Sequence, residues 1–227
     1  MSVELRVRET EEEAARSVAE LLAEAARGGQ EIVLTGGSTP GRAYELAAEL
    51  EPDWSPAGVW WGDERCVPPH DERSNYGLAK RALLDRLGEE PARVHRIRGE
   101  ADPAEAAAEY DDGLRGVTFD LLLLGLGPDG HVASLFPNEP TLEERERLAV
   151  PAQPKLEPFV ERVTLTLPPL RAARTVVFLV TGESKADAVA RAFGGEPRAD
   201  TPGSLVRAES GHTLAVLDRA AAARLQH

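Results

Sequence analysis

Cysteine is nearly absent from this 227-residue sequence, and basic residues are fewer than acidic ones. The single cysteine, Cys66, cannot form an internal disulfide and excludes a metal site built on several cysteines, which is typical of a reducing compartment. The chain has 26 Lys and Arg against 39 Asp and Glu, a formal charge of −13. This balance argues against a nucleic-acid surface, because phosphate backbones are bound by clustered basic side chains.

Long apolar runs and low-complexity segments are also missing. No run approaches the length of a membrane span, and the first twenty residues lack the basic and apolar regions of a secretory signal. We therefore expect a cytoplasmic protein that does not contact membranes. No internal repeat or linker divides the chain, and its 42% hydrophobic content can form one large core. We predict a single domain over residues 1–227, and a monomer.

Short apolar runs alternate with amphipathic stretches along the chain. The predicted strands are 3–7, 32–34, 59–61, 94–97, 119–124, 162–167, 176–180 and 213–217. The first predicted helix begins after a cap at Thr10 and ends at Gly28-Gly29, and the second follows Pro40. Three more predicted helices cover residues 75–87, 104–114 and 184–193. This alternation predicts an α/β fold, with a mostly parallel sheet covered by helices on both faces.

The most informative segment is an apolar run that breaks into glycines and ends in Asp-Gly-His. Leu121–Leu124 is followed by GLGPDGH, which ends at His131. This pattern brings an imidazole to the end of a buried strand, where open α/β sheets place their ligands. Because histidine exchanges protons near neutral pH, we predict that His131 is catalytic. The alternative is a capping histidine beside an Asp129-Gly130 turn.

A second strand end carries the sequence TGGSTP, which covers residues 35–40. Two glycines free the backbone, hydroxyls supply donors, and Pro40 suits the first turn of a helix whose N-terminus attracts anions. This combination predicts a phosphate cradle. The segment lacks the lysine of a Walker loop and the third glycine of the dinucleotide fingerprint, so a tight strand-to-helix turn is the alternative.

A third strand end places Asp63 and Arg65 after the aromatic strand 59–61. An arginine there could bind a carboxylate or phosphate with two donors, and an aspartate could move protons or orient a base. For these two residues we favour a functional role over a surface salt bridge. For Glu72 and Arg73 we favour the salt bridge.

A metal centre is not predicted. His131 has no HxH, HExxH or paired-cysteine partner, and together with Asp129 it would supply only two ligands.

Four strings occur in order over nearly the whole chain: LTGGSTP, WWGDERCVPPHDERSNYGLAKRALL, LLLLGLGPDGHVASLFP and FLVTGESKADAV. Together they resemble the 6-phosphogluconolactonase family. The resemblance implies a modified Rossmann-like α/β fold, shared with sugar-phosphate isomerases and deaminases. It also implies a hydrolase that opens 6-phospho-D-glucono-1,5-lactone in the pentose phosphate pathway. Its partner would be that small sugar-phosphate lactone, with no metal and no organic cofactor.

The resemblance implies roles for individual residues as well. His131 would act as base and then as acid, Asp129 would orient it, and Arg65 would lie near the oxyanion or the phosphate. The phosphate would be held by Gly37, Ser38, Thr39, Arg162 and Lys185. For Lys185 the alternative is an exposed residue in a first helical turn, where a cation is unfavourable unless an anion lies nearby.

Two other functions stay open. Glucosamine-6-phosphate deaminases have related motifs, but their pattern places a glutamate five residues after the histidine and Asp-Glu-Tyr where this chain has Asp63-Glu64-Arg65. Here Phe136 takes the first of these positions, and these departures favour the lactonase, whereas Glu139, farther downstream, keeps the deaminase open as an alternative. A non-catalytic sugar-phosphate sensor would need the phosphate cradle but not His131 and Asp129, whose presence weighs against it.

Overall fold

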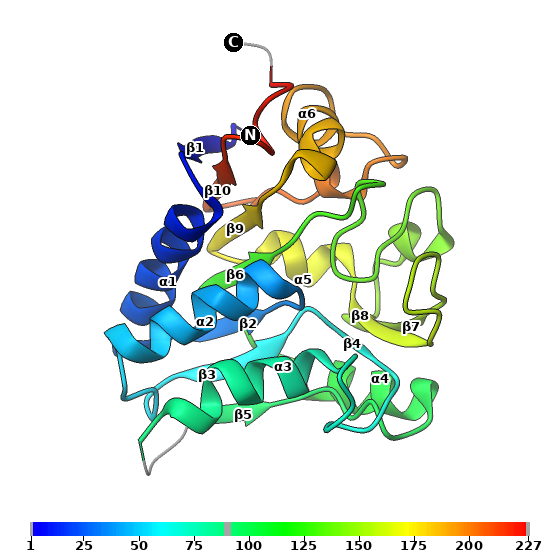
Figure 1. Ribbon diagram of the computed structural model, residues 1–227. Helices are drawn as coiled ribbons and strands as arrows, with labels where there is room; N and C mark the ends of the chain where they lie inside the picture. The colour runs from blue at the N-terminus through cyan, green and yellow to red at the C-terminus, as the bar shows by residue number, and fades with distance from the viewer. Residues whose placement is uncertain (1, 89–91, 226–227) are drawn as a thin grey trace.

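Seven parallel strands form the main sheet of the protein (Figure 1). The computed structural model describes residues 2–88 and 92–225; residues 1, 89–91 and 226–227 of the predicted domain lie outside it. In sheet order the strands are β1 (Glu4–Arg8), β10 (His212–Asp218), β9 (Thr175–Val180), β6 (Leu121–Leu124), β2 (Glu31–Leu34), β3 (Gly58–Trp61) and β5 (Arg93–His95). The expected α/β architecture with a mostly parallel sheet is confirmed.

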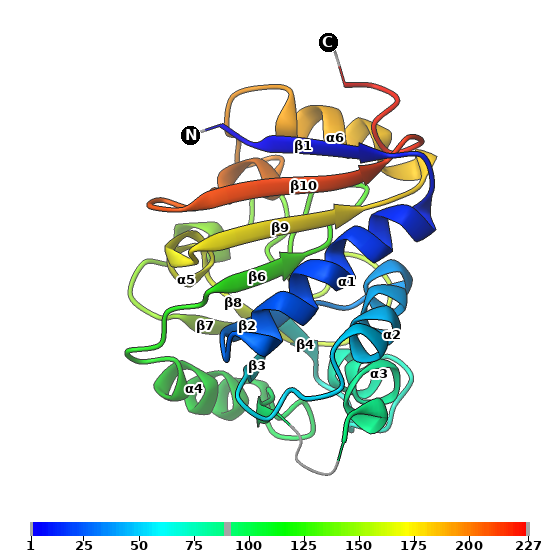
Figure 2. The same cartoon turned by 90° about the vertical axis from the view of Figure 1, so that its left-hand side faces the viewer.

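Helices cover both faces of this sheet. They are α1 (Glu11–Arg27), α2 (Ser38–Leu50), α3 (Asn75–Ala82), α4 (Pro103–Gly113), α5 (Leu167–Ala172) and α6 (Ala186–Phe193). Figure 2 shows α1 and α2 in front of the sheet and α6 behind it. Because both faces are covered, all four leucines of β6 are buried, as expected for a central parallel strand. None of the helices in the described ranges is long and apolar enough to cross a membrane.

The start of α1 follows the predicted capping pattern. Thr10 accepts a hydrogen bond from the Glu13 backbone N–H through its side chain, at 3.2 Å. The Glu13 carboxylate reaches back to the Glu9 backbone N–H at 3.0 Å, one residue earlier than in the usual capping box. These bonds satisfy backbone donors that the first helical turn leaves free.

A second, antiparallel sheet is the main departure from the predicted elements. It consists of β4 (Asp63–Arg65), β8 (Arg162–Leu165) and β7 (Ala149–Ala152), in that order. We expected β8 among the strands of one mostly parallel sheet, and we predicted neither β4 nor β7. Three polar residues in β4, and a proline in the edge strand β7, hide the usual strand pattern.

One predicted helix ends earlier than expected, and one helix was not predicted. The expected helix over 75–87 ends at Ala82, because the backbone at Leu83 leaves helical geometry while its side chain is fully buried. A short 3-10 turn follows. The six residues of α5 were not predicted, and α5 begins two residues after the end of β8, where the expected strand 162–167 still continued.

Buried tyrosines hold the ends of two central strands. The Tyr44 hydroxyl donates to the Thr35 carbonyl at 2.6 Å and accepts from the Thr35 N–H at 2.9 Å. The Tyr110 hydroxyl makes the same pair of bonds with the backbone of Trp61, both at 2.9 Å. The chain segments that leave β2 and β3 are thereby fixed where the predicted motifs begin.

Candidate active site

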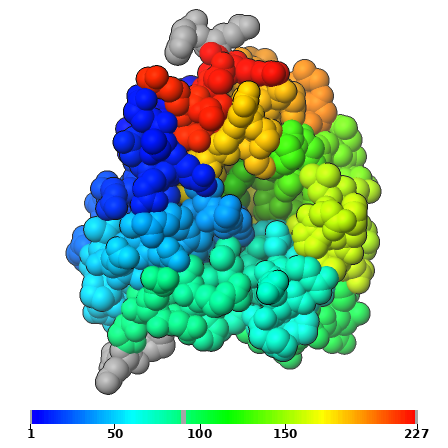
Figure 3. Space-filling model, in the orientation of Figure 1, coloured from blue at the N-terminus to red at the C-terminus, as the bar shows by residue number. Residues whose placement is uncertain are grey.

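A cavity of about 610 Å³ lies at the carboxyl ends of the central strands. Most of the predicted site residues line it: Gly37, Ser38, Thr39, Asp63, Arg65, His131, Arg162 and Lys185. Asp129 is not part of the lining but contacts His131. Figure 3 shows a recessed green area on this face of the molecule. It is surrounded by blue and cyan segments of the N-terminal part, by gold α6 and by the yellow-green chain near residue 155. Segments far apart in the sequence therefore form one site.

His131 and Asp129 form a hydrogen-bonded pair at this site. The His131 Nδ1 lies 2.6 Å from an Asp129 carboxylate oxygen, which also accepts the His131 backbone N–H at 3.1 Å. Burial tends to raise the pKa of the Asp129 carboxyl, but the bonds from His131 outweigh it, and the pKa is lowered. Because an ionised carboxylate only accepts hydrogen bonds, Nδ1 is the nitrogen that carries the hydrogen in a neutral imidazole, and Nε2 is then the acceptor.

The glycine at 127 makes this pair possible. A Cβ atom at Gly127 would lie 2.0 Å from the His131 Nδ1 and 2.6 Å from the Asp129 Oδ1. Its N–H also donates to the His131 carbonyl at 2.9 Å, which closes the turn. A side chain at 127 would therefore displace the imidazole from the carboxylate.

The N-terminus of α2 faces the same cavity. Gly37 occupies its N-cap position, and in the part of the chain that the structure describes no side chain caps this helix. Its first turn has no acidic residue. The free backbone N–H groups and the helix dipole together favour a bound anion.

The Thr39 hydroxyl is engaged within the protein. It donates to the Glu11 carboxylate at 2.6 Å and lies 2.8 Å from the Thr181 hydroxyl. Since the hydrogen of Thr39 is directed to Glu11, Thr181 is the donor of the second bond. Thr39 thus has its backbone N–H, rather than its hydroxyl hydrogen, to offer to a ligand.

Lys185 is the cation nearest in sequence to the end of β9. It closes a 3-10 turn, Glu183–Lys185, and lines the cavity in a partly buried position. Burial lowers the pKa of its ammonium group, and the charge of Asp129 opposes that shift. The ammonium therefore lies close enough to Asp129 to sense its charge.

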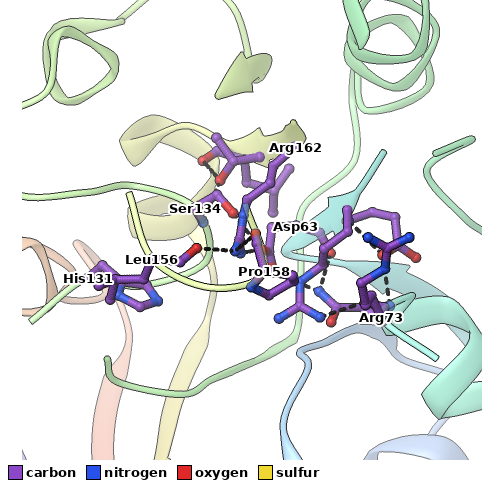
Figure 4. A network of polar contacts seen from close by, with 12 residues as sticks. Asp63, Arg73, His131, Ser134, Leu156, Pro158 and Arg162 are labelled. Atoms are coloured by element: carbon purple, nitrogen blue, oxygen red, sulfur yellow. Dashed lines mark hydrogen bonds and ion pairs between the residues drawn. The ribbon is translucent and has the colours of Figure 1, made fainter. Parts of the chain in front are cut away.

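Arg65 and Arg162 are cross-strand partners in the small sheet. Arg65 donates to the Arg73 carbonyl at 2.6 Å. Arg162 is 3% exposed and donates to the Leu156 and Pro158 carbonyls at 3.4 and 3.2 Å (Figure 4). Burial lowers the pKa of the Arg162 guanidinium. The negative charge of Asp63 opposes this shift, and the positive charge of Arg65 adds to it. Among the described residues, the buried Nε atoms of both arginines have no hydrogen-bond acceptor.

Asp63 points inward and both of its carboxylate oxygens are engaged. One accepts from the Asn75 amide at 3.0 Å, and the other accepts from the Ser134 hydroxyl at 2.6 Å (Figure 4). The second oxygen also lies 3.9 Å from an Arg162 nitrogen. Asp63 therefore links β4 to α3, to the segment that carries His131, and to β8.

Several site residues were not predicted from the sequence. Asn75, at the start of α3, lines the cavity, and a Cβ atom at Gly36 would lie 2.0 Å from its side-chain oxygen. The N-cap of α3 is Ser74, which accepts from the Gly77 N–H. Leu156 and the 64% exposed Phe159 form another wall, on a segment without a motif. Arg73 pairs with Asp71 at the surface, as favoured.

The polar groups of the site are a proton acceptor, hydrogen-bond donors and cations. In residues 2–88 and 92–225, no group of three or more His, Cys, Asp or Glu side chains is arranged to hold a metal ion. The arrangement instead combines a proton acceptor with several donors and positive charges. It can bind an anionic group and remove a proton from a molecule held beside it.

Comparisons with known proteins agree with this chemistry. A family model described as "Glucosamine-6-phosphate isomerases/6-phosphogluconolactonase" matches residues 6–215. A 6-phosphogluconolactonase of Streptomyces coelicolor is 40% identical, over 93% of this chain and 88% of the relative. The human 6-phosphogluconolactonase is 41% identical, over 83% of this chain and 78% of the relative.

Solved structures extend the comparison to the fold. The 6-phosphogluconolactonase of Trypanosoma brucei superposes with a TM-score of 0.88 at 25% identity and covers 99% of both chains. A monomeric glucosamine-6-phosphate deaminase superposes with a TM-score of 0.81, over 98% of this chain and all of that one. At 20% identity, this second likeness concerns the fold alone.

Proposed function

Since the chain belongs to the family of glucosamine-6-phosphate isomerases and 6-phosphogluconolactonases, we propose that it hydrolyses 6-phospho-D-glucono-1,5-lactone to 6-phospho-D-gluconate. The observation that carries this proposal is one cavity containing both the His131–Asp129 pair and the uncapped N-terminus of α2. The first suits proton transfer and the second suits a phosphate. In the cell, the reaction would belong to the oxidative pentose phosphate pathway.

His131 removes the proton of the attacking water. Its Nε2 is the free acceptor of the ring, and Asp129 stabilises the imidazolium that forms. The water oxygen bonds to the lactone carbonyl carbon and gives a tetrahedral oxyanion. When the ring C–O bond breaks, His131 returns the proton to the leaving oxygen. A lactone is an activated ester, so this sequence needs no metal and no organic cofactor.

The phosphate anchors the substrate at the other end of the cavity. The backbone N–H groups of Gly37, Ser38 and Thr39 and the Ser38 hydroxyl are its donors, and Lys185 supplies positive charge. Arg65, with one N–H already on the Arg73 carbonyl, turns its remaining donors to the substrate oxyanion or phosphate.

Asp63 and Arg162 stabilise the walls of the cavity that they line. Both Asp63 oxygens accept hydrogen bonds from protein groups, so we assign it to holding Asn75 and Ser134 rather than to proton transfer. Arg162 adds charge to the cavity and fixes the wall at Leu156 and Pro158. We further propose that the chain works in the cytoplasm as a monomer, without nucleic acid or a membrane.

The deciding experiment measures lactone loss and acid release with freshly made 6-phosphogluconolactone. Wild-type protein is compared with the spontaneous reaction and with His131→Ala in the same buffer. Acceleration that the variant loses supports the proposal, and no acceleration above background refutes it. Release of ammonia from glucosamine 6-phosphate would identify a deaminase instead. Tight sugar-phosphate binding without turnover, unaffected by His131→Ala, would identify a sensor.

A further inference from the structure

Phe136 packs against the His131 imidazole. It is 2% exposed and is not among the residues that line the cavity. The centroid of its ring is 4.8 Å from that of the His131 imidazole, and the two planes are inclined by 40°. Phe136 is therefore a buried neighbour of the imidazole.

The same ring also contacts the buried guanidinium of Arg162. The Arg162 Cζ lies 5.7 Å from the centroid of the Phe136 ring, within the range of a cation–π contact. Arg162 in turn donates to the carbonyls of Leu156 and Pro158, on the cavity wall formed by that segment. Phe136 thus connects the imidazole with the group that fixes this wall.

We infer that Phe136 is a positioning residue that sets the tilt of the His131 imidazole for reaction. This inference rests on the proposed lactonase function. The Asp129 bond fixes the imidazole at Nδ1, but it leaves the ring free to tilt about that contact. A second contact with the imidazole limits this freedom, and the Phe136 ring supplies it.

A small change in tilt has a large effect, because proton transfer requires a productive geometry. Catalytic groups must be held within roughly 0.5 Å and 10–20° of that geometry. A displacement of about 1 Å can cost about 100-fold in rate. Phosphate binding does not depend on the imidazole, so a tilt error lowers kcat and leaves substrate affinity nearly unchanged.

The contact is aromatic for a physical reason. The planar ring packs against the imidazole at an inclination of 40°, and the negative charge density over its face attracts the guanidinium of Arg162. Leucine has branched methyl groups in place of this face and no comparable quadrupole. Phe136→Leu therefore keeps a buried apolar side chain while removing both contacts.

The test compares Phe136→Leu with Phe119→Leu. Phe119 is 3% exposed and packs on Trp60, just before the start of β6, at the sheet edge opposite the cavity. We measure kcat and KM for the lactone, the Kd of 6-phosphogluconate by calorimetry, and the Tm. Phe136→Leu is expected to lower kcat at least tenfold, with KM and Kd within twofold of the wild type. Phe119→Leu is expected to leave kcat, KM and Kd within twofold of the wild type.

Each other outcome is decisive. A kcat within twofold of wild type in Phe136→Leu overturns the inference. A rise in KM and Kd together with the fall in kcat also overturns it, because the ring would then support the whole cavity. If Phe136→Leu does not fold, Phe136→Met, with a flexible side chain that fills gaps, is measured by the same criteria. Wild-type protein without lactonase activity refutes the proposed function itself.

Discussion

Replacing Asp129 with asparagine keeps the size of the side chain and removes its charge. In the wild type, the Asp129 oxygen lies 2.6 Å from the His131 Nδ1, and the two side chains are 28% and 21% exposed. In the proposed reaction the imidazole becomes positive, and the carboxylate stabilises it. Asparagine cannot supply this stabilisation.

The size of the effect follows from this geometry. Opposite charges about 4 Å apart interact by about 4 kcal/mol at an effective dielectric constant of about 20. Partial exposure screens the pair, and we take about 3 kcal/mol. At about 1.4 kcal/mol for each factor of ten, Asp129→Asn should lower kcat about 100-fold. The loss is larger if the amide donates to Nδ1, because the hydrogen then moves to Nε2 and blocks the acceptor.

The assay follows lactone loss at neutral pH over a range of substrate concentrations, with the spontaneous rate subtracted. The matched control is Asp112→Asn, which removes an exposed carboxylate paired with Arg115 and should not change kcat. KM should change little in either variant, because neither residue is proposed to bind the phosphate. An Asp129→Asn kcat within threefold of wild type would refute the role of this pair in proton transfer.

Three further predictions concern other parts of the molecule. Lys185→Met should raise KM about tenfold and leave kcat within threefold, because a charged contact with the phosphate is lost. Lys80→Met, which removes a surface ion pair, should not raise KM. A KM of Lys185→Met equal to that of the wild type would contradict the assignment. Gly36→Ala should lower the free energy of unfolding by about 1–3 kcal/mol, because its Cβ would overlap a buried amide oxygen. Gly113→Ala should not destabilise the protein, because the space around Gly113 is open. Urea unfolding measures the free energy of both variants. A hydrogen bond from an arginine lowers the pKa of Glu100 from 4.5 to about 2. Glu100 therefore contributes stability that is present above pH 4.5 and is lost as the pH falls toward 2. Glu100→Gln should flatten that part of the curve of unfolding free energy against pH, and an unchanged curve would contradict the prediction.

Local chemistry made the central motifs predictable. The apolar run of β6 followed by glycines indicates a buried strand that ends abruptly, and this is what the structure has. The cap at Thr10 and the helix after the Gly-Gly-Ser turn were likewise predicted, because capping and backbone freedom depend on neighbouring residues. The carboxyl ends of neighbouring parallel strands bring Gly37, Ser38, Thr39, His131 and Lys185 to one cavity, and the small antiparallel sheet adds Asp63, Arg65 and Arg162.

Other features depended on contacts between distant segments. The three residues of β4 form a strand only because β8 pairs with them about one hundred residues later. Asp63 and Arg65 are near neighbours in sequence and both line the cavity, yet both Asp63 oxygens accept hydrogen bonds from distant protein groups, whereas the Arg65 guanidinium donates to the nearby Arg73 carbonyl. The Thr39 hydroxyl is directed to Glu11, on a different helix. No sequence pattern reports these partners.

By itself, the sequence determined the alternation of strands and helices, the family, and the residues able to exchange protons or attract an anion. It could do so because periodicity, turn chemistry and side-chain pKa are properties of short segments. The tertiary structure alone decided which of those groups are free to act. Hydrogen-bond partners, burial and ring contacts come from segments far apart in the chain, and they separate the free Nε2 of His131 from the fully engaged carboxylate of Asp63.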